Sequence, residues 1–335
     1  MARGIRPTAW AKAFERSLAA MTRNTLRANS RLVRAGLKAN AQMRKPPPGE
    51  GDWLAGVAMG AAGARHYRLY RPPGVIFGER LPLLVMLHGC GQDARSFALA
   101  TRMNRIAARE RFLVLYPEQD RIANAQGCWN WFDTRSGRAY REAELIMHAI
   151  DQVCLLYLVD RTRIAIAGLS AGASMAALLA TRYPGRFKAL MMHSGVPPGS
   201  ANSTLSAVSA MHGRRAAQPA SAKAPVRAGP WPPLLVIHGS RDRVVAASNA
   251  HAAVQVWADA AGASAAETRS IRRGKRYPMT VTDYKARSKT VATLVEVAQL
   301  AHAWSGGAAR QPHSDGRGPD ASRLMWSFAA KQFRG

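Results

Sequence analysis

The chain has 335 residues, of which 47% are hydrophobic and 20% are charged, and these values fit a globular protein with a sizeable core. No apolar run reaches the roughly 18 residues that a membrane-spanning helix needs, and no secretory signal peptide is visible at the basic N-terminus. The three cysteines are too few, and odd in number, for a disulfide framework. The formal net charge of +28 favours anionic partners, unless it reflects a bias in composition alone.

The first 45 residues carry 11 Lys or Arg side chains and one acid, Glu15. Residues 8–43 are predicted to be helical, because apolar side chains recur there at spacings of three or four. These side chains are Trp10, Phe14, Leu18 and Met21. We therefore expect a basic helical extension over residues 1–45 that docks on an anionic membrane surface or on a polymer granule. The alternatives are an extra helix packed on the domain and a frayed tail.

A linker is expected over residues 46–64, where three consecutive prolines and a glycine end the extension. The catalytic domain is expected over residues 65–335, where strand and helix patterns alternate. Strands are predicted at 65–70, 82–87, 112–116, 162–167, 187–192 and 233–237, and helices at 96–110, 141–157 and 171–183. This alternation predicts an α/β fold with a doubly wound, mostly parallel sheet. Residues 197–232, rich in Ser, Ala, Gly and Pro, are predicted to form a loop or lid insertion.

The five residues from Gly168 to Gly172 read Gly-Leu-Ser-Ala-Gly and stand between a predicted strand and a predicted helix. This context is typical of a nucleophile elbow, a tight turn that exposes a serine at the end of a strand. A serine hydroxyl is a weak nucleophile until a base removes its proton. Ser170 is therefore the candidate nucleophile, and it requires a histidine and an acid later in the chain.

Asp242 lies just past a predicted strand and is the candidate acid, with a turn-capping role as the alternative. His302 and His313 are the candidate bases. His302 is favoured, because it follows an apolar run and begins a Gly-rich loop, whereas His313 stands in a polar stretch. The alternative for either histidine is a surface position without a role.

Two backbone amides are expected to stabilise the oxyanion of an ester intermediate. One belongs to Ala171, which follows the nucleophile, and the other to Cys90, in the Gly-rich loop after an early strand. His88 is expected to hold that loop in place. This chemistry needs no metal and no organic cofactor.

Six stretches of the sequence resemble the esterase family of poly(3-hydroxybutyrate) depolymerases, whose relatives include feruloyl and acetylxylan esterases. They are LHGCGQ (87–92), CWNWF (128–132), IAGLSAGASMA (166–176), HSG (193–195), IHGSRD (237–242) and HAWSGG (302–307). The resemblance implies an α/β-hydrolase fold, the triad of Ser170, Asp242 and His302, and the oxyanion hole at Cys90 and Ala171. It also implies that three tryptophans line the substrate cleft, where core packing is the alternative reading: Trp129, Trp131 and Trp304.

The sequence departs from the family pattern in three respects. Ala301 stands before the histidine, where glycine is usual, and Gly91 replaces a more usual polar residue. No signal peptide, linker and polymer-binding domain are recognisable, which puts action on extracellular polymer in doubt. Cys90 and Cys128 are expected near one another, but a reducing compartment argues against a disulfide. Cys154 is expected in the core.

These features predict a serine carboxylic ester hydrolase that acts through an acyl-enzyme on short-chain hydroxyalkanoate esters or oligomers, or on feruloyl-type esters. One alternative is a serine peptidase of the prolyl-oligopeptidase type, which would use the same triad. The other is a non-catalytic protein that binds granules or nucleic acid through its positive charge. A cytoplasmic location is expected, in association with granules or a membrane surface, whereas the family resemblance favours an extracellular one.

Overall fold

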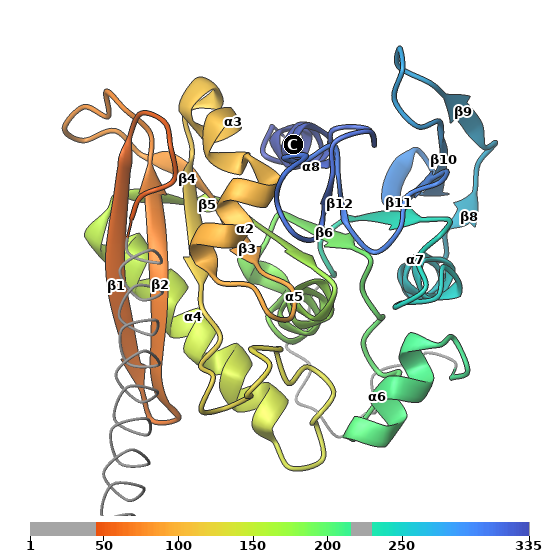
Figure 1. Ribbon diagram of the computed structural model, residues 1–335, viewed down its shortest axis with the longest axis horizontal. Helices are drawn as coiled ribbons and strands as arrows, with labels where there is room; N and C mark the ends of the chain where they lie inside the picture. The colour runs from red at the N-terminus through yellow and green to blue at the C-terminus, as the bar shows by residue number, and fades with distance from the viewer. Residues whose placement is uncertain (1–44, 216–229, 335) are drawn as a thin grey trace, which may run out of the picture. The chain divides into compact units, whose positions relative to one another are not determined.

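An 11-stranded sheet forms the centre of the computed structural model, which describes residues 45–215 and 230–334 (Figure 1). The strand order is β1-β2-β4-β3-β5-β6-β7-β11-β10-β8, with β9 paired to β10 beside β8. The strands are β1 (Asp52–Gly60), β2 (Gly63–Arg71), β3 (Leu81–Leu87), β4 (Leu113–Pro117), β5 (Val159–Leu169), β6 (Ala189–His193), β7 (Leu234–Gly239), β8 (Ser264–Ala265), β9 (Arg269–Ile271), β10 (Met279–Ala286) and β11 (Lys289–Val297). A separate parallel pair joins β12 (Trp304–Ser305) to β13 (Ser314–Asp315).

The six strands from β4 to β11 in the middle of this order are parallel, and antiparallel strands flank them on both sides. Every residue of β3, β4, β6 and β7 is buried. Continuous apolar strands of this kind require cover on both faces of the sheet, because side chains alternate between the two faces. The predicted mostly parallel sheet is therefore confirmed.

Helices cover both faces of the sheet and form two apolar cores. One core contains side chains of α4 (Arg138–Leu156), α5 (Ala171–Arg182) and α7 (Ser248–Ala261). The other contains side chains of α2 (Ala94–Thr101), α3 (Met103–Glu110) and α8 (Ala321–Gln332). The remaining helices among residues 45–215 and 230–334 are the short η1 (Pro184–Arg186) and α6 (Thr204–Met211). None of the helices in the described ranges is both long and apolar enough to cross a membrane.

The structure corrects three of the predicted elements. Much of the expected linker is strand β1, which pairs antiparallel with β2 and forms one edge of the sheet. The helix expected over 96–110 is divided at Arg102, whose φ of 55° ends α2 and begins α3. The insertion at 197–232 contains helix α6, while its residues 216–229 lie outside the described chain. The extension expected over residues 1–45 lies outside it as well, apart from Lys45.

Candidate active site

Ser170 stands at the turn between β5 and α5, with φ of 55° and ψ of −121°. Positive φ is uncommon outside glycine, and a strained serine between strand and helix is the mark of a nucleophile elbow. The turn is closely packed on both sides of the serine. A Cβ added at Gly168 would lie 2.3 Å from the backbone of Gly172, and one added at Gly172 would lie 2.2 Å from the carbonyl oxygen of Leu87. Only glycine fits at either position, and this holds the serine at the end of the strand.

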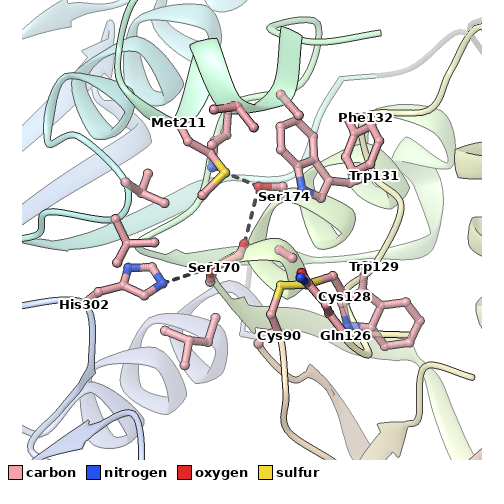
Figure 2. Close-up of a pocket in the computed structure, with 18 of the residues that line it drawn as sticks. Cys90, Gln126, Cys128, Trp129, Trp131, Phe132, Ser170, Ser174, Met211 and His302 are labelled. Carbon is pink, nitrogen blue, oxygen red and sulfur yellow. Dashed lines mark hydrogen bonds between the residues drawn. A yellow bond between two sulfur atoms is a disulfide. The ribbon is translucent and has the colours of Figure 1, made fainter. Parts of the chain in front are cut away.

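A chain of hydrogen bonds connects Ser170 to His302 and Asp242. The Ser170 Oγ lies 2.9 Å from the His302 Nε2 (Figure 2), and the His302 Nδ1 lies 2.7 Å from the Asp242 Oδ2. Asp242 follows β7 and His302 follows β11, which are adjacent parallel strands, so their carboxyl ends bring both loops beside the serine. The structure places His302 and not His313 on Ser170. The His313 side chain is exposed at the wall of the pocket, and its carbonyl accepts from the Trp304 amide.

The carboxylate of Asp242 is buried and is fixed at both oxygens. Its Oδ1 accepts hydrogen bonds from the amides of Val244 and Val245, so Asp242 caps its turn as well as facing His302. Burial alone would raise the pKa of Asp242, but the hydrogen bond and charge of His302, with the Val245 amide, outweigh it and lower that pKa. Asp242 is therefore ionised where it faces the histidine.

The pocket in front of Ser170 has a volume of 540 Å³ and a mostly apolar lining. Figure 2 shows Trp131, Phe132 and Met211 on one side of Ser170, and His302 on another. Helix α6 adds Ala207 and Val208 to the same wall as Met211. An apolar pocket with few polar groups fits a hydrocarbon part of a substrate, held close to the serine.

The expected oxyanion amides lie at this pocket, because both Cys90 and Ala171 line it. Within the described residues, neither backbone N–H donates a hydrogen bond to another protein group. The loop of Cys90 is fixed by the Gly91 amide, which donates to the Gln126 carbonyl, and by a disulfide between Cys90 and Cys128. The expectation of unpaired thiols from a reducing compartment is thus wrong for the structure. The free Cys154 is buried, as expected.

The three tryptophans occupy different places. Trp131 lines the pocket and meets Phe132 edge to face. Trp129 also lines it, although its side chain is buried and its Nε1–H donates to the His88 carbonyl. Trp304 is fully buried, stacks on His193 and contributes nothing to the pocket lining. Its expected place in the cleft is therefore wrong, and the alternative of core packing describes it.

A buried polar network that sequence reasoning missed connects the loop after β3 with the loop after β4, beside Ser170. Glu142, on α4, accepts hydrogen bonds from the Gln119 amide group and from both nitrogens of Asn130. Gln119 accepts in turn from the buried guanidinium of Arg65. The Gln119 backbone amide donates to the Nε2 of His88, whose Nδ1 bonds the Gly89 carbonyl. The network joins segments that are far apart in the sequence, so no local sequence pattern predicts it.

The doubly wound sheet and a serine elbow facing a histidine and an acid define an α/β-hydrolase fold. The chain belongs to the family described as esterase PHB depolymerase, whose model matches residues 65–275.

Known relatives agree with this family. The chain is 33% identical over 181 residues to a poly(3-hydroxyalkanoate) depolymerase C of Paucimonas lemoignei, a match that covers 52% of this chain and 44% of that protein. It is 26% identical over 208 residues to a probable acetylxylan esterase A of Aspergillus clavatus, with 58% and 66% covered. The chain thus spans less than two thirds of either curated relative. Among solved structures, an acetyl xylan esterase from Aspergillus awamori matches with a TM-score of 0.60 at 19% identity, over 76% of this chain and 94% of that one, which supports the fold.

Proposed function

We propose that the protein is a serine carboxylic ester hydrolase that acts through an acyl-enzyme. The observation that carries the proposal is the hydrogen-bond chain from Ser170 through His302 to a buried, ionised Asp242, at the wall of an apolar pocket. A serine with a base in hydrogen-bond reach, and a base oriented by a third group, is the arrangement that nucleophilic acyl transfer needs. Membership of an esterase family supports an ester as the substrate.

In the proposed mechanism, the Ser170 Oγ attacks the ester carbonyl while the His302 Nε2 takes its proton. The amides of Cys90 and Ala171 donate to the oxyanion of the tetrahedral intermediate. His302 then gives the proton to the departing alcohol, and the acyl group stays on Ser170. A water molecule, deprotonated by His302, attacks the acyl-enzyme, which releases the acid and restores the serine. Asp242 keeps the His302 Nδ1 protonated and stabilises the positive ring.

The proposed substrates are short-chain hydroxyalkanoate esters or oligomers, with feruloyl-type esters as the alternative. The names of the relatives support both groups, since they include a poly(3-hydroxyalkanoate) depolymerase and a feruloyl esterase B. The 540 Å³ pocket, lined by Trp131, Phe132 and Met211, provides an apolar site for a short acyl chain or an aromatic ring.

The test of the proposed nucleophile is Ser170→Ala, assayed on p-nitrophenyl butyrate and with a fluorophosphonate probe. We expect hydrolysis to fall by about 10³-fold or more and labelling by the probe to disappear, because the acyl-enzyme cannot form. Ser288→Ala, in the exposed turn between β10 and β11, is the matched control. Full activity of Ser170→Ala would overturn the proposal.

Assays of the wild-type protein distinguish the other two candidate functions from ester hydrolysis. A serine peptidase would cleave an aminoacyl p-nitroanilide faster than the simple ester. A non-catalytic binding protein would show neither hydrolysis nor probe labelling. A panel of hydroxybutyrate oligomers and methyl ferulate, tested with wild type and Ser170→Ala, then identifies the substrate group.

A further inference from the structure

Two loops that line the pocket on the side of His302 also carry exposed arginines. Arg241 and Arg243 flank Asp242 in the loop after β7, and both are exposed. Arg310 is exposed in the connection between β12 and β13, and His313, from the same connection, lines the pocket itself. We call the three arginines the cationic rim.

The rim is tied closely to the triad by its backbone. The Arg241 amide donates to the Leu300 carbonyl, two residues before His302. Val244 and Val245, which follow Arg243, line the pocket and donate their amides to the Asp242 Oδ1. The arginines therefore extend from the same short turn that fixes the catalytic carboxylate.

No acidic side chain neutralises the rim within the described chain. Arg241, Arg243 and Arg310 form no ion pair there, whereas other arginines do, such as Arg163 with Asp160 and Arg269 with Asp283. Residues 298–313 contain no Asp or Glu. The carboxylate of Asp242, between two of the arginines, is buried against His302 and is not available to them. The rim thus keeps its positive charge toward solvent, in loops whose neighbouring residues Val244, Val245 and His313 line the pocket.

The proton transfer from His302 to the leaving group determines which part of an ester lies on the side of the rim. The His302 Nε2 gives its proton to the leaving alcohol, so the alcohol part must lie on the His302 side of Ser170. Figure 2 shows the Cys90–Cys128 disulfide, Gln126 and Trp129 on the opposite side. A charge carried by the alcohol part therefore lies on the side of the loops that bear the rim, while the acyl part lies away from them.

We propose that the cationic rim selects esters whose alcohol part carries a carboxylate, such as the carboxyl-terminal unit of a short hydroxyalkanoate oligomer. This inference rests on the proposed ester hydrolysis. Cleavage breaks the acyl–oxygen bond, water supplies the hydroxyl of the new acid and the hydrogen of the new alcohol, and the released hydroxy acid is an anion. The preferred substrates are then soluble anionic oligomers, cleaved next to their free acid end, rather than neutral esters.

The test compares two esters that differ only in charge, 4-acetoxybenzoate and 4-acetoxybenzamide. The measured quantity is the ratio of their kcat/KM values in wild type and in Arg241→Gln/Arg243→Gln, at low salt. We expect the ratio to fall about fivefold or more in the double variant, since two charges of the rim are lost. Raising NaCl to about 0.5 M should lower the wild-type ratio as well, because salt screens exposed charges. Arg105→Gln on α3, which contributes nothing to the pocket lining, removes a charge elsewhere as the control.

Two further variants keep the outcome decisive. Arg243→Lys should retain most of the ratio, and Arg243→Glu should reverse the preference toward the neutral ester. An unchanged ratio in the double variant, or an equal fall in Arg105→Gln, would overturn the inference. The neutral 4-acetoxybenzamide separates this failure from failure of the proposed function: if wild type cleaves neither ester, the hydrolase proposal itself fails. Hydrolysis of the free dimer of 3-hydroxybutyrate, compared with its carboxamide, extends the test to the proposed substrate.

Discussion

The orientation of one imidazole ring decides whether Ser170 is a nucleophile. The His302 Nδ1 faces the Asp242 Oδ2 at 2.7 Å, so the proton on that ring belongs to Nδ1 and the Nε2 is free to accept from Ser170. Because the pKa of Asp242 is held below its ordinary value, this carboxylate stays ionised when the pH falls into the weakly acidic range. The reactivity of Ser170 therefore depends on the charge of Asp242, which Ser170 does not contact.

Replacing Asp242 by Asn tests this dependence. The side-chain oxygen of Asn still accepts from the Val244 and Val245 amides, so we expect the turn to fold. Its NH₂ group, however, donates to the His302 Nδ1, and the ring proton must then lie on Nε2. A protonated Nε2 cannot accept the proton of Ser170. We expect kcat on p-nitrophenyl butyrate at about pH 7 to fall roughly 10³- to 10⁴-fold. A fall of less than tenfold, in protein whose circular dichroism matches wild type, would remove Asp242 from the mechanism.

The candidate triad residues, which the structure brings within hydrogen-bond distance of one another, share a local signal in the sequence. Ser170, Asp242 and His302 each follow a strand, and the carboxyl ends of parallel strands meet at one edge of the sheet. Trp304 also follows such a strand, but its burial depends on contacts with Phe97 and His193, from distant parts of the chain. Such contacts follow from tertiary packing, which spacing along the sequence does not determine.

At the scale of elements, the close packing of α5 against the end of β3 holds Ser170 at the end of β5. Gly172, in the first turn of α5, lies directly against the backbone of Leu87 at the end of β3. The helix can approach the strand this closely only because no Cβ stands between them.

The variant Gly172→Ala tests this packing. A Cβ 2.2 Å from the Leu87 carbonyl oxygen must push α5 away from the sheet, and Ser170 moves with the helix. We expect the free energy of unfolding to fall by about 3 kcal/mol and activity to fall more than the loss of folded protein explains. Urea titration and kcat of the folded fraction measure both quantities. Gly185→Ala, where an added Cβ meets nothing within 4 Å, is the control, and equal losses in the two variants would contradict this account.

Elements were predictable where their own residues determine them. The central strands are continuous apolar runs buried on both faces, so their pattern was sufficient. Strand β1 contains two alanines, two glycines and only one β-branched residue, Val57, and it exists through its pairing with β2. The end of α2 was missed for a similar reason, since an arginine and not a glycine adopts the left-handed conformation there.

At the scale of the whole molecule, buried histidines link stability to pH. Burial lowers the pKa of His88 to about 4 and that of His193 to about 3, from an ordinary value of 6.5. The His88 Nε2 accepts a hydrogen bond from the Gln119 backbone amide, and the His193 Nε2 accepts one from the Ser305 backbone amide. Only the neutral form of each ring can accept at Nε2. Below pH 6.5 the unfolded chain therefore binds protons that the folded chain cannot bind.

The sign of the effect follows from this proton balance: the free energy of unfolding falls as the pH drops from 6.5 toward the folded pKa values. Between about pH 7 and pH 4.5 each histidine should cost on the order of 2 kcal/mol. Urea unfolding at these two values tests the prediction in wild type and in His88→Gln/His193→Gln, whose amide oxygens can still accept but do not titrate. The double variant should begin less stable and then lose less stability on acidification than wild type. The exposed His66, replaced by Gln, should leave the wild-type loss unchanged. If the double variant lost as much stability as wild type over this range, other titratable groups, such as the buried His238 whose pKa is also lowered, and not these two histidines would govern the acid sensitivity of the fold.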